Sequence, residues 1–319
     1  MALPEFDLRG IILDATRRFL VGKPEGFDFP RDPGFVPVLQ LSSILGKAIP
    51  VAAGPTAPLK HPGDTALDQH QSDQAGIDLL LQIMRESPEP ALISVVGSAR
   101  IIAVAFNREP ELMRKKTKRI LLNAGATAVT RDEWNANLDT AAYVKLWRSG
   151  LPIDWYPCAT ERGAFDLEHE RGTHWQASHD VLLKDLPSKM KSWFAYSFAG
   201  NGRGDIIRAL DELGSGAVWE HILSAHRSLW STASIIMAAD RVLAHTPEGW
   251  RFLPALAAGG NTWPLTLEHV AAAVQDNGQV DWKLSANATG YRIFRRQPSR
   301  EYSAAMAEAL HALLRSIRC

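Results

Sequence analysis

The first half of the chain alternates short apolar runs with amphipathic stretches, and this alternation limits the folds that it can adopt. The runs are continuously apolar, which is typical of strands that helices cover on both faces. We expect strands at residues 10–13, 49–53, 91–96, 119–123 and 152–156. Helices are expected at residues 74–85, 99–107 and 139–148. The sequence therefore predicts an α/β fold with a mostly parallel, Rossmann-like sheet flanked by helices.

The second half predicts a different mixture of elements. Apolar faces at helical spacing favour helices over residues 189–198, 205–213, 218–239 and 302–317. Short strands are expected at residues 241–245, 250–253, 280–284 and 291–295. We treat residues 1–319 as one domain, with residues 1–158 as the sheet core and residues 159–319 as a largely helical C-terminal half.

The charge balance narrows the class of partner. The chain has 35 basic and 35 acidic residues, so it carries no net field that would attract nucleic acid or an anionic membrane surface. No apolar run reaches membrane-spanning length, and the first residues lack the pattern of a secretory signal. We therefore expect a cytoplasmic protein that binds a small molecule, with a homo-oligomer left open.

A polar cluster follows the strand predicted at residues 119–123. Glu133 and Asn135 lie two residues apart on the loop, and Asn123 ends the strand before them. A carboxylate and an amide so placed can accept from and donate to neighbouring sugar hydroxyls. The other interpretation is structural, with the cluster marking a helix entry and Asp139 capping the next helix. Trp134, between the two polar residues, is a candidate for contacting the ligand.

This segment resembles the inosine-uridine preferring nucleoside hydrolase family, which carries a Glu-aromatic-Asn motif followed by an Asp that opens a helix. The resemblance extends from about Gly10 to Cys158 and includes the turn Gly97-Ser98-Ala99-Arg100. It implies hydrolysis of the N-glycosidic bond of a ribonucleoside to ribose and base. Glu133, Trp134, Asn135, Asn123 and Arg100 would then be substrate-binding residues.

The family's metal loop, Asp-x-Asp-Pro-Gly-x-Asp-Asp after the first strand, has no counterpart in this sequence. The resemblance implies calcium bound by the aspartates of that loop, so the metal ligands here are unknown. Asp14 is the best substitute, because it follows the apolar run at residues 10–13 and would lie at the carboxyl end of a strand. An Asp that merely caps a turn is the alternative.

Two further positions take roles from the resemblance. Arg100 aligns with a residue whose carbonyl binds metal in the family, and its guanidinium could instead bind a carboxylate or phosphate, or face solvent on a helix. The family's late His-Asp pair has two candidates in this chain. His179-Asp180 has the right residues but follows too closely behind the strand at residues 152–156, and His226 lies at a better distance but lacks the Asp. We prefer His226, with Asp14, as the catalytic candidates.

The leading hypothesis is therefore a nucleoside hydrolase-like protein. Two alternatives remain: a catalytically inactive nucleoside- or sugar-binding protein on the same scaffold, and an interaction module. The chain has ten tryptophans, whose faces can stack on bases and sugars or fill a core. A tryptophan-rich surface on the second half would favour the module.

Overall fold

The computed structural model describes residues 3–14, 34–128, 132–199 and 205–318. Its centre is a six-stranded sheet in the order β11-β10-β12-β5-β4-β3. The strands are β3 (Ala91–Val95), β4 (Thr117–Leu122), β5 (Ile153–Trp155), β10 (Leu265–Val274), β11 (Val280–Leu284) and β12 (Tyr291–Arg296). Pairing is parallel from β3 through β12, and β10 runs antiparallel to both of its neighbours. The predicted α/β fold with a mostly parallel sheet is confirmed.

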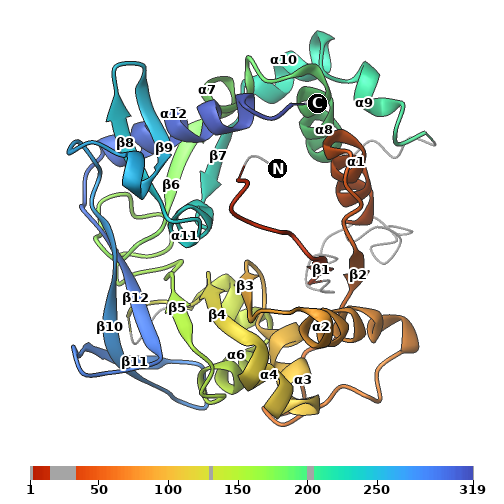
Figure 1. Ribbon diagram of the computed structural model, residues 1–319, viewed down its shortest axis with the longest axis vertical. Coiled ribbons are helices and arrows are strands. Elements are labelled where there is room, and N and C mark those ends of the chain that lie inside the picture. The colour runs from red at the N-terminus through yellow and green to blue at the C-terminus, as the bar shows by residue number, and fades with distance from the viewer. Residues whose placement is uncertain (1–2, 15–33, 129–131, 200–204, 319) are drawn as a thin grey trace.

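Three smaller sheets complete the described strands. β1 (Ile11–Leu13) and β2 (Val51–Ala53) pair in parallel beside β3 (Figure 1). The other two sheets are antiparallel pairs: β6 (Trp175–Ser178) with β7 (His226–Leu229), and β8 (Arg241–Thr246) with β9 (Gly249–Pro254). The first-half strands therefore all lie close to where the sequence predicts them.

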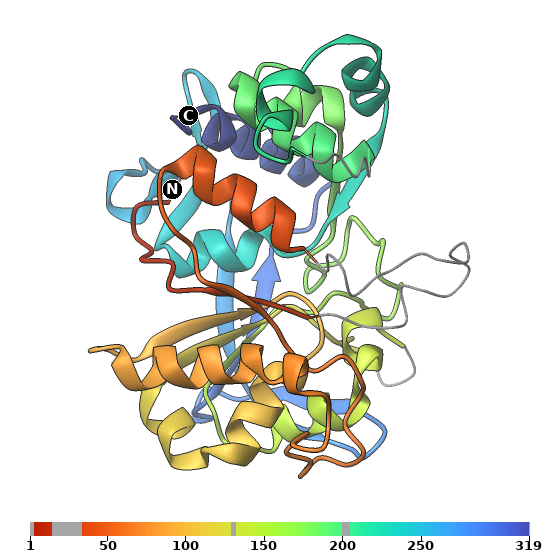
Figure 2. The ribbon, with the colours of Figure 1, turned by 90° about the vertical axis from the view of Figure 1, so that its right-hand side faces the viewer.

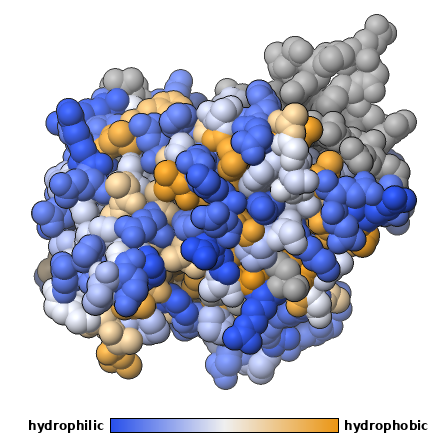
Figure 3. Space-filling view, turned by 90° about the horizontal axis from the view of Figure 1, so that it is seen from above, coloured by the Kyte–Doolittle hydropathy of each residue, from blue (hydrophilic) through white to orange (hydrophobic). Residues whose placement is uncertain are grey.

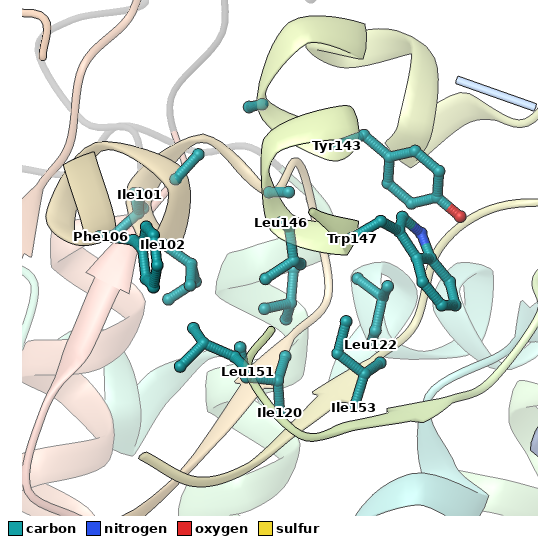
Figure 4. Close-up of a cluster of buried hydrophobic side chains, with 14 of the residues drawn as sticks. Ile101, Ile102, Phe106, Ile120, Leu122, Tyr143, Leu146, Trp147, Leu151 and Ile153 are labelled. Carbon is teal, nitrogen blue, oxygen red and sulfur yellow. The ribbon is translucent and has the colours of Figure 1, made fainter. Parts of the chain in front are cut away.

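Helices from the first half cover one face of the central sheet (Figures 1 and 2). They are α2 (Ala75–Glu86), α3 (Arg100–Arg108), α4 (Pro110–Lys116), α5 (Trp134–Leu138) and α6 (Thr140–Trp147). In the core between them, Ile120 and Leu122 of β4 pack in one cluster with Leu146 and Trp147 of α6 (Figure 4). Because side chains alternate along a strand, Leu121 belongs to a cluster on the other face, with Ala233 of α11 (Thr232–Ala238).

A second layer lies above the sheet and has its own core (Figure 2). Besides α11, the helices of this layer are α1 (Phe35–Leu45), α7 (His179–Leu183), α8 (Ser188–Ala199), α9 (Ala209–Glu212), α10 (Gly216–Leu223) and α12 (Glu301–Arg315). The apolar stripe of the last helix joins this core, with Tyr302 and Met306 fully buried beside Trp175. Among the described residues, no helix is long and apolar enough to cross a membrane.

The structure corrects three expectations for the second half. The helix predicted at residues 218–239 is wrong, because α10 and α11 are separated there by strand β7. β6 and β10 have no counterpart in the prediction. Finally, β10, β11 and β12 all join the central sheet, so the sheet extends well beyond residue 158.

Candidate functional site

A cavity of about 1230 Å³ lies between β1, β3 and the upper layer. Open α/β sheets bind ligands at the carboxyl ends of their strands. At that end the cavity is lined by Asp14, Ser98, Trp134 and Asn135. The upper layer contributes Met190, Ile235, Leu313 and Ile317. Three of the predicted site residues, Asp14, Trp134 and Asn135, therefore share one cavity.

Asp14 follows the last residue of β1 and bridges to the turn after β3. Its carboxylate accepts hydrogen bonds from the Ser98 amide at 2.5 Å and the Ser98 hydroxyl at 2.8 Å. Gly97 allows this approach, since a Cβ there would lie 2.5 Å from the carboxylate. Burial raises the pKa of Asp14 above its usual value, and the Ser98 hydrogen bonds oppose that shift. Asp14 is therefore held in place next to the cavity with a strengthened affinity for a proton.

Glu133 is the N-cap of α5. Its buried carboxylate accepts hydrogen bonds from the main-chain amides of Gly125 at 2.7 Å, Asn135 at 3.0 Å and Ala136 at 3.0 Å. A Glu that satisfies both helix-start amides and a loop amide fixes the path of the chain around the motif. The contacts of Glu133 are thus those expected of a residue that begins a helix. Glu133 is not among the residues that line the cavity.

Asn135 and Asn123 are joined by a hydrogen bond behind the cavity. The side-chain amide of Asn135 donates to the main-chain carbonyl of Asn123 at 2.9 Å. The Asn123 side chain donates to the carbonyls of Val95 at 3.0 Å and Leu121 at 3.3 Å, and it is buried. Asn123 therefore ties the ends of β3 and β4 together and supports Asn135, which lines the cavity.

Arg100 is fully buried, so a solvent-facing position on a helix is wrong. Its Nε donates to Asp139 at 2.8 Å, and its other nitrogens donate to main-chain carbonyls, including Pro55 at 2.9 Å. Asp139 in turn caps α6 by accepting from Ala142 at 3.0 Å, which confirms its predicted capping role. A buried pair with this many hydrogen bonds locks α3 to the start of α6. The guanidinium binds a carboxylate, and that carboxylate belongs to the chain itself.

Trp134 and His226 differ in their relation to the cavity. Trp134 is 48% exposed and lines the cavity. All ten tryptophans lie in the described residues, and Trp134 alone among them is exposed. His226 is exposed on β7, where it pairs with Ser178 of β6, and is not one of the lining residues. His226 therefore does not line the cavity that Asp14 lines, and its catalytic role stays a prediction.

Comparisons with known proteins place this geometry in context. No family model matches the chain. The chain is 29% identical over 174 residues to the pyrimidine-specific ribonucleoside hydrolase RihA of Citrobacter koseri. This alignment covers 48% of the chain and 52% of the Citrobacter protein. The chain is 26% identical to the RihA of Salmonella arizonae over the same shares of each chain. The chain spans about half the length of the curated relatives that it matches.

A solved structure extends the likeness to nearly the whole fold. The purine-preferring ribonucleoside hydrolase from Gardnerella vaginalis aligns with a TM-score of 0.51 at 15% identity. The alignment covers 98% of this chain and 93% of the Gardnerella chain. The chain is therefore similar in sequence to ribonucleoside hydrolases over about half of its length, and similar in fold to one of them over nearly all of it.

The described residues do not fit the calcium that the resemblance implies. They contain no group of three or more His, Cys, Asp or Glu side chains placed to hold a metal. The Asp14 carboxylate lies 3.9 Å from the buried Arg100 cation, and Glu133 uses both of its oxygens on main-chain amides.

The candidate site also includes residues that the sequence prediction did not assign. Ser98 holds Asp14 through two hydrogen bonds. Its position in the turn at residues 97–100, directly after a strand, is the sequence feature that could have identified it. Leu313 and Ile317 pack against the core of the upper layer and also line the cavity. Only the assembled fold brings the last helix next to the carboxyl ends of β1 and β3.

Proposed function

We propose that the chain hydrolyses the N-glycosidic bond of a ribonucleoside. The observation that carries the proposal is the cavity at the carboxyl ends of β1 and β3, where Asp14 lies with Asn135 and the exposed Trp134. The likeness to ribonucleoside hydrolases supports the choice of substrate class. The cytoplasmic location and the small-molecule partner expected from the sequence belong to the same proposal, and a homo-oligomer stays open.

Asp14 would act as the general base. Its raised pKa suits a carboxylate that removes a proton from water. The water oxygen forms a bond to the anomeric carbon as the carbon–nitrogen bond breaks, and the departing base keeps the electron pair and takes up a proton. Asn135 would hold ribose hydroxyls, and Trp134 would cover the ligand. The transition state resembles an oxocarbenium ion, as in glycoside hydrolysis generally.

The test is ribose release from a panel of purine and pyrimidine nucleosides, measured with added calcium and with a chelator. We expect Asp14→Asn to lower kcat at least about 100-fold, the usual size of a general-base contribution. Asp211→Asn, an exposed carboxylate on α9, is the matched control and should leave kcat unchanged. Circular dichroism establishes that both variants are folded. Equal kcat for Asp14→Asn and the wild-type chain would contradict the assignment.

A binding protein without turnover is the second candidate. It is favoured because both Glu133 oxygens accept from main-chain amides, and because the described residues contain no group of side chains placed to hold a metal. Saturable quenching of Trp134 fluorescence by nucleosides, without ribose release, would identify this function.

The interaction module has less support. The tryptophans of the second half are buried or half-buried. On the face seen from above, hydrophobic and hydrophilic residues are interspersed (Figure 3).

A further inference from the structure

The hydroxyl of Ser98 lies between two groups that fix the direction of its hydrogen bonds. On one side its oxygen accepts from the main-chain amide of Arg100 at 3.3 Å. On the other side it donates to Oδ1 of Asp14 at 2.8 Å. Because an amide N–H can only donate, the hydroxyl proton of Ser98 is directed to the Asp14 carboxylate. Ser98 is 4% exposed, so bulk water does not compete strongly for these contacts.

The second oxygen of Asp14 has a partner of a different kind. Oδ2 accepts from the main-chain amide of Ser98 at 2.5 Å. That amide has no acceptor site, so it stabilises Oδ2 only while this oxygen carries no proton. Oδ1 instead faces a hydroxyl, which has one donor and two acceptor sites and can rotate. The two oxygens of Asp14 are therefore not equivalent toward a proton.

The nearby Arg100 cation does not prevent Asp14 from taking up a proton. Its Nη1 is 3.9 Å from Oδ1 of Asp14, whereas its Nε donates directly to Asp139 at 2.8 Å. Coulomb attraction weakens with distance, so Asp139 is the stronger partner of the guanidinium. Burial raises the pKa of Asp14 most, and the negative charge of Asp139 acts in the same direction. Asp14 can therefore become neutral while Arg100 keeps its buried partner.

A purely structural role for Ser98 is the alternative. A serine hydroxyl that accepts from the amide two residues further on stabilises a local turn, and Ser98 lies just before α3. Such a turn uses only the acceptor sites of the oxygen. It does not account for the bond that the same hydroxyl donates to Asp14, which is 84 residues away in the sequence.

We propose that Ser98 is a positioning residue for Asp14, with a hydroxyl that donates to Oδ1 of the carboxylate and accepts from Oδ1 once that oxygen holds a proton. In the proposed hydrolysis the attacking water loses its proton to Oδ1 as its oxygen bonds to the anomeric carbon. The electron pair of the carbon–nitrogen bond leaves with the base, which takes up a proton. Ser98 keeps its own proton and turns it toward the cavity that it lines. The inference rests on the proposed function, because Asp14 is the base of that reaction.

Ribose release by Ser98→Ala and Ser98→Thr tests the role of the hydroxyl. Ser98→Ala keeps the main-chain amide and loses the group that serves Oδ1 in both of its forms. We expect kcat to fall about tenfold or more and KM to change less than about threefold, because the orientation of the base matters in the transition state. Ser98→Thr keeps a hydroxyl and should recover most of the lost kcat. Equal kcat in Ser98→Ala and the wild-type chain would overturn the proposal.

Ser149 supplies a matched control for a structural effect. It is 5% exposed, and its hydroxyl donates to the Leu146 carbonyl at 2.7 Å and accepts from the Leu151 amide at 3.1 Å. It is not among the residues that line the cavity. Ser149→Ala should therefore lower the stability measured by urea denaturation and leave kcat unchanged. A loss of kcat in Ser149→Ala as large as that in Ser98→Ala would contradict the positioning role.

Carbon-13 NMR of the aspartate side-chain carboxyls tests the same contact without any reaction. Asp14→Asn identifies the Asp14 signal, whose titration with pH is then followed in the wild-type chain and in both Ser98 variants. Burial raises the pKa of Asp14 and the Ser98 hydroxyl opposes that shift, so Ser98→Ala should move the midpoint to higher pH. Ser98→Thr should return it. An unchanged midpoint in Ser98→Ala would overturn the proposal.

The two readouts separate this inference from the proposed function. If the midpoint moves as expected but the wild-type chain releases no ribose, the proposed hydrolysis is wrong and the control of Asp14 by Ser98 stands. If ribose is released and Ser98→Ala changes neither kcat nor the midpoint, the hydrolysis stands and the positioning role is wrong.

Discussion

A single carboxylate organises the loop that carries the candidate motif. Glu133 accepts three main-chain hydrogen bonds while buried, so its removal leaves three donors without an acceptor. Hydrogen bonds to a charged group contribute about 1.5–3 kcal/mol each, and loss of an N-cap costs about 0.5–2 kcal/mol. We predict that Glu133→Ala lowers the free energy of unfolding by about 2 kcal/mol or more, measured by urea denaturation.

The neighbouring residue provides the control. Asp132 is exposed, and Asp132→Ala should change stability by less than about 0.5 kcal/mol. If Glu133 instead binds ligand directly, Glu133→Ala will weaken nucleoside binding while leaving the unfolding transition in place. That result would restore the direct-contact role predicted from the sequence.

His174 gives the protein a stability that depends on pH. Its ring is 2% exposed and packs on Trp230 with ring centroids 4.9 Å apart. Burial lowers its pKa below the usual 6.5, and the pKa of His179 is lowered for the same reason. Below about pH 6.5 the unfolded chain takes up protons that the native state resists, so stability should fall with falling pH.

Urea denaturation at pH 7.5, 6.5 and 5.5 measures this dependence. His174→Phe should reduce the slope of stability against pH by less than about 1.4 kcal/mol per pH unit, the limit for one proton. His221→Gln, on the exposed surface of α10, should leave the slope unchanged. A wild-type slope retained in His174→Phe would contradict the prediction.

At the scale of elements, three neighbouring strands are tied together by one buried carboxylate. Asp154 of β5 is 3% exposed. It accepts from Arg119 of β4 at 3.0 Å and through both oxygens from Arg292 of β12 at 2.7 Å. Removing one partner of a buried pair leaves charge without compensation. We predict that Arg292→Met lowers the free energy of unfolding by about 1–3 kcal/mol.

The same strand supplies a control for this prediction. Arg295 lies three residues further along β12 and pairs with Glu170 at the surface, at 2.9 Å. Exposed pairs contribute about 0–1 kcal/mol, so Arg295→Met should have little effect on the urea midpoint. Equal destabilisation by the two variants would show that the buried pair has no special role.

Elements set by local sequence were predictable, and those set by distant pairing were not. The continuous apolar runs of β3 and β4 and the Asp139 cap of α6 are local signals, and the structure confirms them. β7 was predicted as helix because its strand state depends on pairing with β6 about fifty residues earlier. β10 was missed because it contains three consecutive alanines, which have low strand propensity.

For the candidate site, too, features set by local sequence were predictable and those set by distant contacts were not. The motif around Trp134 and the strand-end position of Asp14 lie in the local sequence, and the structure brings both to one cavity. The roles of Glu133 and Arg100 could not be read locally, because they depend on which amides and carboxylates the fold brings to them. The same holds for Leu313 of α12 and for Ile317, which follows that helix, because both reach the cavity only in the assembled molecule.

On the scale of the whole molecule, the two cores are joined by the central sheet. One core lies between the sheet and α2, α3 and α6, and the other lies among the helices of the upper layer. β12 contributes to both sides of the sheet, with Ile293 on the lower face and Phe294 on the upper. The two layers therefore depend on a strand that comes near the end of the chain.

The parallel pairing of β5 with β12 determines when the central sheet can be completed during synthesis of the chain. Asp154 and Arg292 are 138 residues apart, and synthesis proceeds at about 5–20 residues per second, so roughly 7–28 seconds pass between them. Throughout that interval the edge of β5 has no β12 to cover it. The sheet therefore stays open beside β5 until β12 (Tyr291–Arg296) has been synthesised.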